Sequence, residues 1–293
     1  MMISSAMGLF LMKSMRIRKT TRSVIPGFGL TLGITISMLS FLIIIPLASI
    51  LVKSLSLSPS EFMKIILAPK VLYAFGTSIL CSFIAAVINS VFGLILAWTL
   101  VRYEFPGKRI LDGLIELPFA LPTAVAGITL SKLYSDTGLI GSFFAKFGVR
   151  ISYTHIGLSI ALIFIGIPFV VRAVQPVLEK LDAQYEEAAY TLGANGRTAF
   201  FRVILPELRP ALLVGFGLAF ARGIGEYGSV IYISGNSVKN HTQVISYIIM
   251  QKLNYMDYSG ATTIALVMLI ISFLLLFGIN IVQIHQTKRT NNV

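Results

Sequence analysis

Apolar residues run along the chain in long blocks separated by short polar stretches, and this pattern decides the fold class. A helix of about twenty apolar residues crosses the roughly 30 Å hydrocarbon layer of a bilayer. Because lipid offers no partner to backbone groups, such blocks must be helical. We therefore predict an all-α polytopic protein with six transmembrane helices, at residues 28–52, 74–101, 116–133, 156–177, 211–233 and 261–284.

The third predicted span, residues 116–133, differs from the others because it is short and contains Pro118 and Pro122. Proline has no backbone N–H and breaks or kinks a helix. Broken backbone is not tolerated against lipid, so this span is expected to face other helices or a water-lined path. Pro118, Pro122 and the adjacent Thr123 are therefore candidates for lining a translocation path.

Composition agrees with the apolar blocks. The chain has 293 residues, of which 56% are hydrophobic and 12% charged, and its mean hydropathy is +0.84. These values are typical of integral membrane proteins. We expect a basic N-terminal arm at 1–27, a membrane domain at 28–284 and a tail at 285–293. Lysine and arginine are more frequent in the loops on the side of both termini, which places that side in the cytoplasm by the positive-inside rule.

Several kinds of chemistry are not indicated. The segment GANGRT at 193–198 lacks the spacing and the lysine of a phosphate-binding loop, so we expect no ATP binding or hydrolysis in this chain. The three histidines lie far apart in sequence, and neither a metal, a cofactor nor a catalytic triad is indicated. The net charge of +12 is explained by topology and anionic lipid, so no nucleic acid is needed. The single cysteine, Cys81, lies in an apolar block and is expected to be a small buried residue.

Four ionisable residues lie inside the predicted spans, where charge is costly and marks partners or function. Glu116 and Arg172 lie near inner ends, and their side chains can snorkel to the interface. Arg222 and Glu226 are four residues apart and can pair along one helix face. Glycines beside them permit close approach of another helix or of solute. Two interpretations of this pair stay open: a structural ion pair, or a lining of the transport path.

The polar stretch at 186–206 separates two strongly apolar blocks and is predicted to form a helix, a turn and a second helix. Asp182 is a suitable N-cap, and Glu186 and Glu187 place negative charge in the first turn, where the helix dipole favours it. Gly193 can adopt the left-handed conformation that ends a helix. We predict that the first helix stops there.

The second half of this stretch is predicted as a short separate helix. Gly196 permits another bend, and Thr198 can cap a helix with one apolar face. Pro206 and Pro210 are expected to separate it from the next span. The whole element is predicted to lie outside the bilayer and to dock into a groove of a partner.

The spacing of Glu187-Ala188-Ala189, Gly193 and Leu205-Pro206 resembles the EAA motif of binding-protein-dependent ABC importer permeases. Val203 stands where that motif has isoleucine, which is a smaller but apolar residue. The resemblance implies a coupling helix that seats in a cleft of a separate ATP-binding subunit. The residues to which it assigns this coupling are Glu186, Glu187, Ala188, Ala189, Gly193, Val203, Leu205 and Pro206.

Three further segments are similar to the sulfate and thiosulfate branch of that family, in particular to its T subunits: residues 77–98, 120–128 and 225–236. This resemblance implies import of sulfate or thiosulfate by alternating access. It also implies three partners: a dimer of ATP-binding subunits, a second homologous permease of the W type, and an external sulfate-binding protein. Molybdate or other oxyanion permeases share the architecture and remain an alternative.

Two other classes of protein are compatible with a polytopic chain. A secondary transporter would work without an ATPase, and a non-transporting scaffold would need no broken span. The compartment also stays open. Frequent Ile, Lys, Asn and Phe are typical of an AT-rich genome, and the resemblance extends to permeases of this type encoded in green-algal and bryophyte plastids. The resemblance therefore favours a plastid membrane over a bacterial inner membrane.

Overall fold

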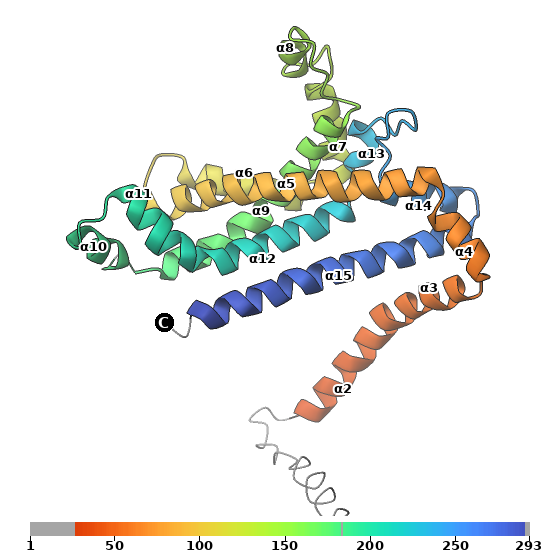
Figure 1. The fold of residues 1–293 in the computed structure, drawn as a ribbon, viewed down its shortest axis with the longest axis horizontal. Helices are drawn as coiled ribbons and strands as arrows, with labels where there is room; N and C mark the ends of the chain where they lie inside the picture. The colour runs from red at the N-terminus through yellow and green to blue at the C-terminus, as the bar shows by residue number, and fades with distance from the viewer. Residues whose placement is uncertain (1–26, 183, 291–293) are drawn as a thin grey trace, which may run out of the picture. The chain divides into compact units, whose positions relative to one another are not determined.

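In the computed structural model the described residues, 27–182 and 184–290, form helices joined by turns and contain no strand (Figure 1). The chain divides into two compact units, Met1–Ser49 and Ile50–Val293, which are described separately. The predicted N-terminal arm lies almost wholly outside the described residues. The first unit holds α2 (Phe28–Leu39), the π-helical η1 (Ser40–Ile44) and the start of α3 (Ile45–Leu55). The second holds α4 (Pro59–Ile66), α5 (Pro69–Arg102), α6 (Lys108–Ala120), α7 (Thr123–Leu133), α8 (Gly141–Ala145), α9 (His155–Lys180), α10 (Gln184–Thr191), α11 (Gly196–Ala199), the π-helical η2 (Phe200–Ile204), α12 (Leu205–Ile224), α13 (Val230–Ile233), α14 (Ile245–Asn254) and α15 (Tyr258–Thr290).

Long apolar helices account for about half of the chain. Five of them can cross a membrane by length and composition: Phe28–Leu55, Pro69–Arg102, His155–Lys180, Gly196–Ile224 and Tyr258–Ile284. A sixth crossing is possible only if α6 and α7, which meet at an angle of 112°, count as one broken span. The all-helical membrane fold is confirmed, as five spans and one bent pair. Helix α15 continues to Thr290, past the predicted end of the last span.

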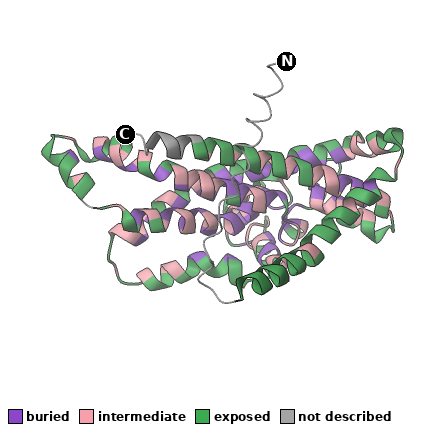
Figure 2. Ribbon diagram, turned by 90° about the horizontal axis from the view of Figure 1, so that it is seen from below, coloured by how far each residue is buried: buried purple, intermediate pink, exposed green. Residues whose placement is uncertain are grey.

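Helices α5, α9 and α12 pack side by side as the centre of the second unit, where buried residues gather (Figure 2). Val170 on α9 is completely buried between two glycines of its neighbours. A Cβ at Gly93 of α5 would lie 2.7 Å from the Val170 side chain, and one at Gly215 of α12 would lie 2.7 Å from its Cα. Small residues allow this close packing, which replaces the hydrophobic effect as the attraction between helices in lipid.

Prolines interrupt these helices less than expected. The predicted break before residue 211 is wrong, because the helix runs from Gly196 to Ile224 through Pro206 and Pro210. The π-helical segment η2 ends two residues before Pro206, and η1 likewise ends two residues before Pro46. A proline removes one backbone hydrogen bond and crowds the preceding turn. A π-helical turn relieves that crowding without ending the helix.

The broken span is where proline does redirect the chain. Pro118 lies buried inside α6 without ending it, whereas Pro122 lies at the break and immediately precedes α7. The break predicted for residues 116–133 is therefore present, but at Pro122 alone. The helix before the break begins at Lys108, earlier than the predicted start at residue 116. Beyond the break, α7 packs mainly against α13. The fifth predicted span, 211–233, is wrong at its end too: α12 stops at Ile224, and a turn leads into the short α13.

Candidate coupling element and translocation path

Helix α10 has defined signals at both ends. The Asp182 carboxylate accepts the backbone N–H of Gln184 at 3.1 Å, as an N-terminal cap. At the other end Gly193 is left-handed, with φ of +83°, and its N–H bonds the Tyr190 carbonyl at 2.9 Å. The N–H of Ala194 bonds the Ala189 carbonyl at 3.0 Å, which completes a Schellman motif. The predicted end of the helix at Gly193 is confirmed.

The next helix begins differently from the prediction. Asn195, and not Thr198, is its N-cap: the Asn195 Oδ1 accepts both the backbone N–H and the hydroxyl of Thr198 at 2.8 Å. Asparagine is among the preferred N-cap residues, and the amide that it binds lies three residues on. This signal was present in the sequence, but Gly196 was interpreted as a bend and it is the first residue of α11.

Arg102, at the end of α5, ties α10 to the bundle. One of its terminal nitrogens lies 2.9 Å from the Glu186 carboxylate and 3.4 Å from the Leu181 carbonyl, just beyond the end of α9. Its guanidinium also lies 5.6 Å from the centre of the Trp98 ring. The sequence did not predict this contact, because nothing in the local pattern connects Arg102 with Glu186. The contact fixes α10 to the ends of two spans.

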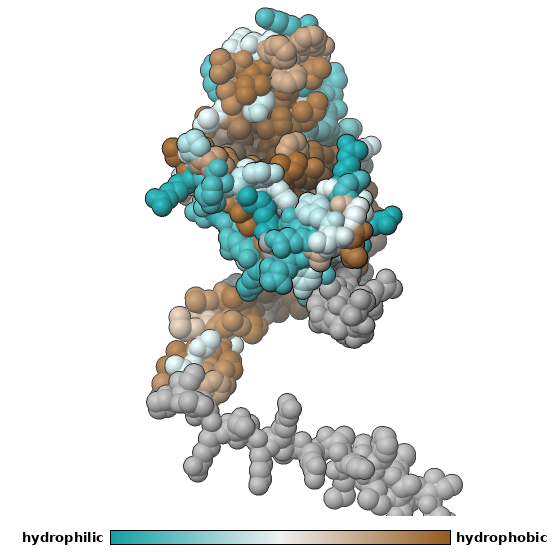
Figure 3. All heavy atoms as spheres, turned by 90° about the vertical axis from the view of Figure 1, so that its left-hand side faces the viewer, coloured by the Kyte–Doolittle hydropathy of each residue, from teal (hydrophilic) through white to brown (hydrophobic). Residues whose placement is uncertain are grey.

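The other residues of the motif divide between core and surface. Ala189 is buried, and Val203, Leu205 and Pro206 are half-buried. Glu187 and Ala188 are exposed. Around them Tyr185, Tyr190, Leu192 and Phe201 are at least half exposed, with Leu192 at 89%. Figure 3 views this end of the molecule and shows it mostly hydrophilic, with apolar residues gathered on the part above it. The loop thus presents isolated large apolar side chains outside the bundle.

We expect Arg102→Gln to loosen α10 without unfolding the chain. The substitution removes the ion pair to Glu186 and weakens the bond to Leu181. Both side chains of the pair are 22% exposed, and a partly exposed pair of this kind contributes on the order of 1 kcal/mol. Hydrogen exchange of the α10 amides should accelerate, while that of α5 and α9 stays unchanged. Arg109→Gln, an exposed arginine at the start of α6, is the matched control. Equal hydrogen exchange of the α10 amides in wild type and Arg102→Gln would contradict the conclusion that Arg102 holds α10 to the bundle.

The segments 120–128 and 225–236 are brought together at the break between α6 and α7. A Cβ at Gly127 would overlap the Ser229 backbone, and one at Gly228 would overlap the Thr123 hydroxyl. Close approach of backbone explains why these positions are glycine. Thr123 is half-buried and Pro122 exposed. Three of the candidate path residues, Pro118, Pro122 and Thr123, thus lie within the bent pair of helices α6 and α7.

Arg222 and Glu226 do form an ion pair, at 2.5 Å, but not along one helix. Arg222 lies in the last turn of α12, and Glu226 lies beyond its end. The Glu226 side chain is 2% exposed, and its other oxygen accepts the backbone N–H of Ser229 at 2.9 Å and the Ser229 hydroxyl at 3.1 Å. The Ser246 hydroxyl donates to the Glu226 carbonyl at 2.6 Å. The carboxylate therefore holds the turn that packs on α7.

Arg172 of α9 joins two carboxylates of α6. It lies 2.8 Å from Asp112 and 2.7 Å from Glu116, which are one helical turn apart. Glu116 and Arg172, for which snorkelling was an alternative, are thus paired with each other across two helices. Asp112 was missed because it precedes the predicted span. An acid four residues before Glu116, on the same helix face, was the available signal.

The histidines make ordinary contacts where the structure describes them. His155 Nε2 lies 3.1 Å from the His241 carbonyl, and the His241 ring stacks on Tyr73 at 3.9 Å. Within the described residues no cluster of three or more His, Cys, Asp or Glu side chains could hold a metal. Cys81 is buried, as predicted.

These features define the class: a polytopic helical membrane protein with one broken span and a helical loop between two spans. A family profile described as binding-protein-dependent transport system inner membrane component matches residues 89–292. The sulfate transport system permease protein CysT of Escherichia coli is 46% identical over 270 residues, or 92% of this chain and 97% of the relative. The probable sulfate transport system permease protein of Marchantia polymorpha is 43% identical over 88% of this chain and 90% of the relative. The probable one of Nephroselmis olivacea is 46% identical over 84% of this chain and 86% of the relative. The chain belongs to this family of permease components, among the CysT-type proteins.

Solved structures agree on the fold. A chain from the crystal structure of a bacterial ABC transporter involved in the import of alginate superposes with a TM-score of 0.73 at 14% identity, over 88% of this chain and 95% of the other. A bacterial alginate ABC transporter in complex with a periplasmic protein gives a TM-score of 0.71 at 15% identity, over 90% and 95%. At such low identity the likeness establishes the shared fold alone.

Proposed function

We propose that this chain is the membrane permease subunit of an ATP-driven importer of sulfate and thiosulfate that works by alternating access. The observation that carries the proposal is the 46% identity to a sulfate transport system permease protein over 97% of that relative. The five spans and the broken sixth supply the membrane path. Residues 28–284 are the transport domain in this proposal, flanked by a basic arm at 1–27 and a tail at 285–293.

We infer that the loop from Glu186 to Pro206 docks on a separate ATP-binding subunit, which acts as a dimer and hydrolyses the ATP. Glu187 and Ala188 are exposed for contact, whereas Ala189 packs inward and Glu186 is bound by Arg102. Gly193 ends the docking helix, and Val203, Leu205 and Pro206 connect it to α12. Isolated exposed residues such as Leu192 suit a groove in a partner.

Rigid connections support a lever mechanism. When the ATP-binding subunits close, α10 is carried with them. The contacts of Arg102 with Glu186 and Leu181 transmit that movement to the ends of α5 and α9. The spans then change their packing angles as intact helices, because their backbone hydrogen bonds cannot open in lipid. In this proposal the junction of α7 with the turn at 225–229, including Pro118, Pro122, Thr123, Arg222 and Glu226, forms one wall of the path.

The remaining partners follow from the family. Its description names a binding protein, so we propose an external sulfate-binding protein as the source of the anion. A second homologous permease of the W type would complete the path. The relatives come from bacteria and from green algae and a liverwort, and we favour a plastid membrane, with a bacterial inner membrane as the alternative.

Uptake of labelled sulfate into vesicles tests the proposal. Vesicles that hold this chain with its second permease, the ATP-binding subunit and the binding protein should accumulate sulfate only when ATP is present on the side of α10. Excess thiosulfate should compete, and excess molybdate should compete more weakly. Uptake without the ATP-binding subunit would instead support a secondary transporter, and preferential uptake of molybdate would move the chain to another oxyanion.

Gly193→Ala is expected to uncouple ATP hydrolysis from transport. A Cβ at this position meets no atom within 4 Å, so the only penalty is the left-handed backbone, about 1 kcal/mol. That strain should shift the Schellman turn and misdirect α10. Sulfate uptake per ATP hydrolysed should fall, while the amount of permease in the membrane stays the same; Gly193→Val should show a larger loss.

Gly196→Ala is the matched control. Gly196 lies three residues away in the same loop, outside the left-handed region, and the nearest atom to its added Cβ is 3.9 Å distant. Alanine at the start of a helix should leave coupling unchanged. If Gly193→Ala and Gly193→Val both assembled with the ATP-binding subunit and transported as well as Gly196→Ala, the coupling role of this loop would be wrong.

A further inference from the structure

A cavity of about 430 Å³ lies at the opposite end of α5 from Arg102, between α4, α14 and the turn that precedes α15. Its lining combines two kinds of residue. Ile65, Ala68, Val71 and Ile248 are apolar, and they belong to or pack against a buried cluster of α5, α14 and α15. Lys64, Lys70 and Lys252 come from three different helices and place ammonium groups around it. We call this cavity the lysine pocket.

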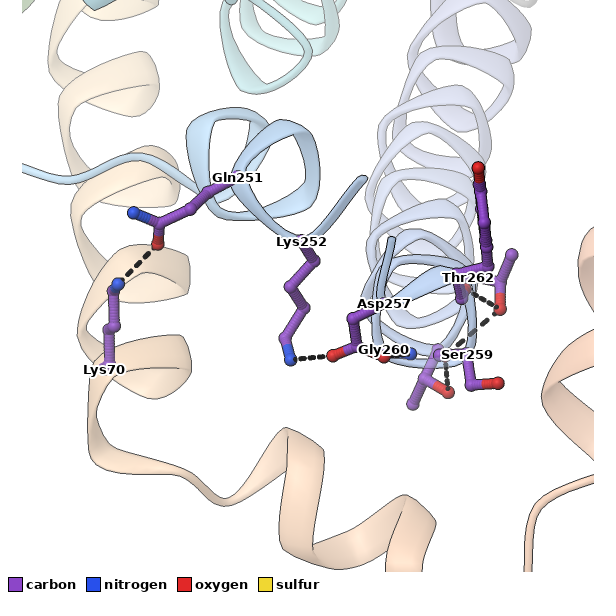
Figure 4. A network of polar contacts seen from close by, with 9 residues as sticks. Lys70, Gln251, Lys252, Asp257, Ser259, Gly260 and Thr262 are labelled. Carbon is purple, nitrogen blue, oxygen red and sulfur yellow. Dashed lines mark hydrogen bonds and ion pairs between the residues drawn. The ribbon is translucent and has the colours of Figure 1, made fainter. Parts of the chain in front are cut away.

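The charges of the lysine pocket are only partly compensated. Lys252 Nζ lies 2.6 Å from the Asp257 carboxylate, which also accepts the Gly260 N–H at 2.8 Å (Figure 4). The hydrogen bond from Lys252, and then that from Gly260, hold the pKa of Asp257 below its ordinary value, so this carboxylate stays ionised. Lys70 donates to the neutral Gln251 side chain at 2.6 Å. Among the described residues Lys70 has no carboxylate within ion-pair distance. Lys64 has none among them either, but it interacts electrostatically with Glu61, three residues before it on α4.

The length of α5 places the lysine pocket at the depth of lipid headgroups. Thirty-four residues at 1.5 Å each give α5 a length of about 51 Å. A bilayer with its headgroups is about 40–45 Å thick, so both ends of this helix reach the headgroup layer or beyond. Met63, Leu67 and Tyr255 flank the pocket and are more than half exposed. Apolar and aromatic side chains beside lysines are typical of residues at the membrane interface.

We propose that the lysine pocket binds the phosphate headgroup of an anionic lipid. Uncompensated ammonium groups attract a phosphate, and the apolar lining beside them suits the start of an acyl chain. A free sulfate or phosphate ion could bind the same ammonium groups, but it fits less well, because it would lose water against Ile65, Val71 and Ile248, which an acyl chain can cover and a free ion cannot use. A bound lipid would join α4, α5 and α14 at the end of the molecule away from α10. The proposal depends on the chain lying in a membrane, and not on which anion it transports.

Lipid titration followed by native mass spectrometry tests the site in the complete chain. Phosphatidylglycerol should bind more tightly than phosphatidylcholine. The double substitution Lys64→Gln/Lys70→Gln should weaken phosphatidylglycerol binding by about five-fold for each lysine removed. Lys132→Gln/Lys146→Gln is the matched control, since both lysines are exposed and neither lines the pocket. An equal loss in the control pair, or equal binding of the two lipids, would overturn the proposal.

Two further measurements complete the test. The first distinguishes loss of the site from misfolding of the chain, and the second distinguishes a bound lipid from a bound free ion. Asp257→Asn releases Lys252 from its counter-ion while leaving an oxygen for the Gly260 N–H, and should tighten phosphatidylglycerol binding by about five-fold. Misfolding cannot produce such a gain. Inorganic sulfate and glycerol phosphate, added as competitors, should displace the lipid poorly. Displacement by inorganic sulfate at the concentration of the lipid would identify an ion site and contradict the lipid assignment. Because sulfate uptake is not measured here, failure of this proposal leaves the proposed transport function intact.

Discussion

Gly127→Ala is expected to separate α7 from the turn that follows α12 and to abolish transport. An added Cβ would overlap the Ser229 carbonyl and lie 2.6 Å from the Ser229 Cα. Both atoms belong to the backbone, so no side chain can rotate away to relieve the clash. Overpacking of this kind costs about 1–3 kcal/mol, and more when backbone must shift. Sulfate uptake should be lost, and the melting temperature of the purified chain should fall by about 2–4 °C for each kcal/mol.

Gly113→Ala provides the comparison for this substitution. Gly113 lies on α6, on the other side of the break, and nothing lies within 4 Å of an added Cβ. Alanine favours a helix over glycine by about 1 kcal/mol, so this variant should be at least as stable as wild type. If Gly127→Ala melted at the same temperature as Gly113→Ala, the backbone at Ser229 would move away from α7 more easily than this close packing implies.

The sequence predicted those parts of the fold that depend on local pattern. Long apolar blocks were sufficient to locate the spans, although not all of their ends, since lipid requires continuous helices of a known length. Gly193 was sufficient to end α10, because a left-handed turn there has few other residue choices. Pro122 marked the break between α6 and α7. In each case the residue acts on the backbone within one or two turns of itself.

The sequence failed where the outcome depends on how a helix absorbs strain or on residues far apart in the chain. Pro206 was interpreted as a break, but a π-helical segment accommodates it, and no local pattern distinguishes the two outcomes. The pairs of Arg102 with Glu186 and of Arg172 with Asp112 join different helices, so they follow from packing alone. The contact of Gly127 with Ser229 joins residues about one hundred positions apart in the sequence, so it also follows from packing alone.

Arg222→Met is expected to be the most damaging change at the end of α12. It leaves the almost fully buried Glu226 side chain without its ion-pair partner, with only the Ser229 donors to stabilise it. Removing one partner of a buried pair costs about 3–5 kcal/mol, and somewhat less here because Arg222 is about one third exposed. Thermal unfolding of the purified chain measures this loss, and sulfate uptake should fall with it.

Adding Glu226→Gln to Arg222→Met separates the two roles that the pair can have. Glutamine carries no charge and keeps an oxygen for the Ser229 N–H, so the double variant should recover most of the stability that Arg222→Met loses. If the pair only holds the turn against α7, sulfate uptake should recover together with the melting temperature. If the exposed part of Arg222 meets the anion along the path, the double variant should be stable and still fail to transport. A double variant no more stable than Arg222→Met would contradict the ion pair as the source of the stability.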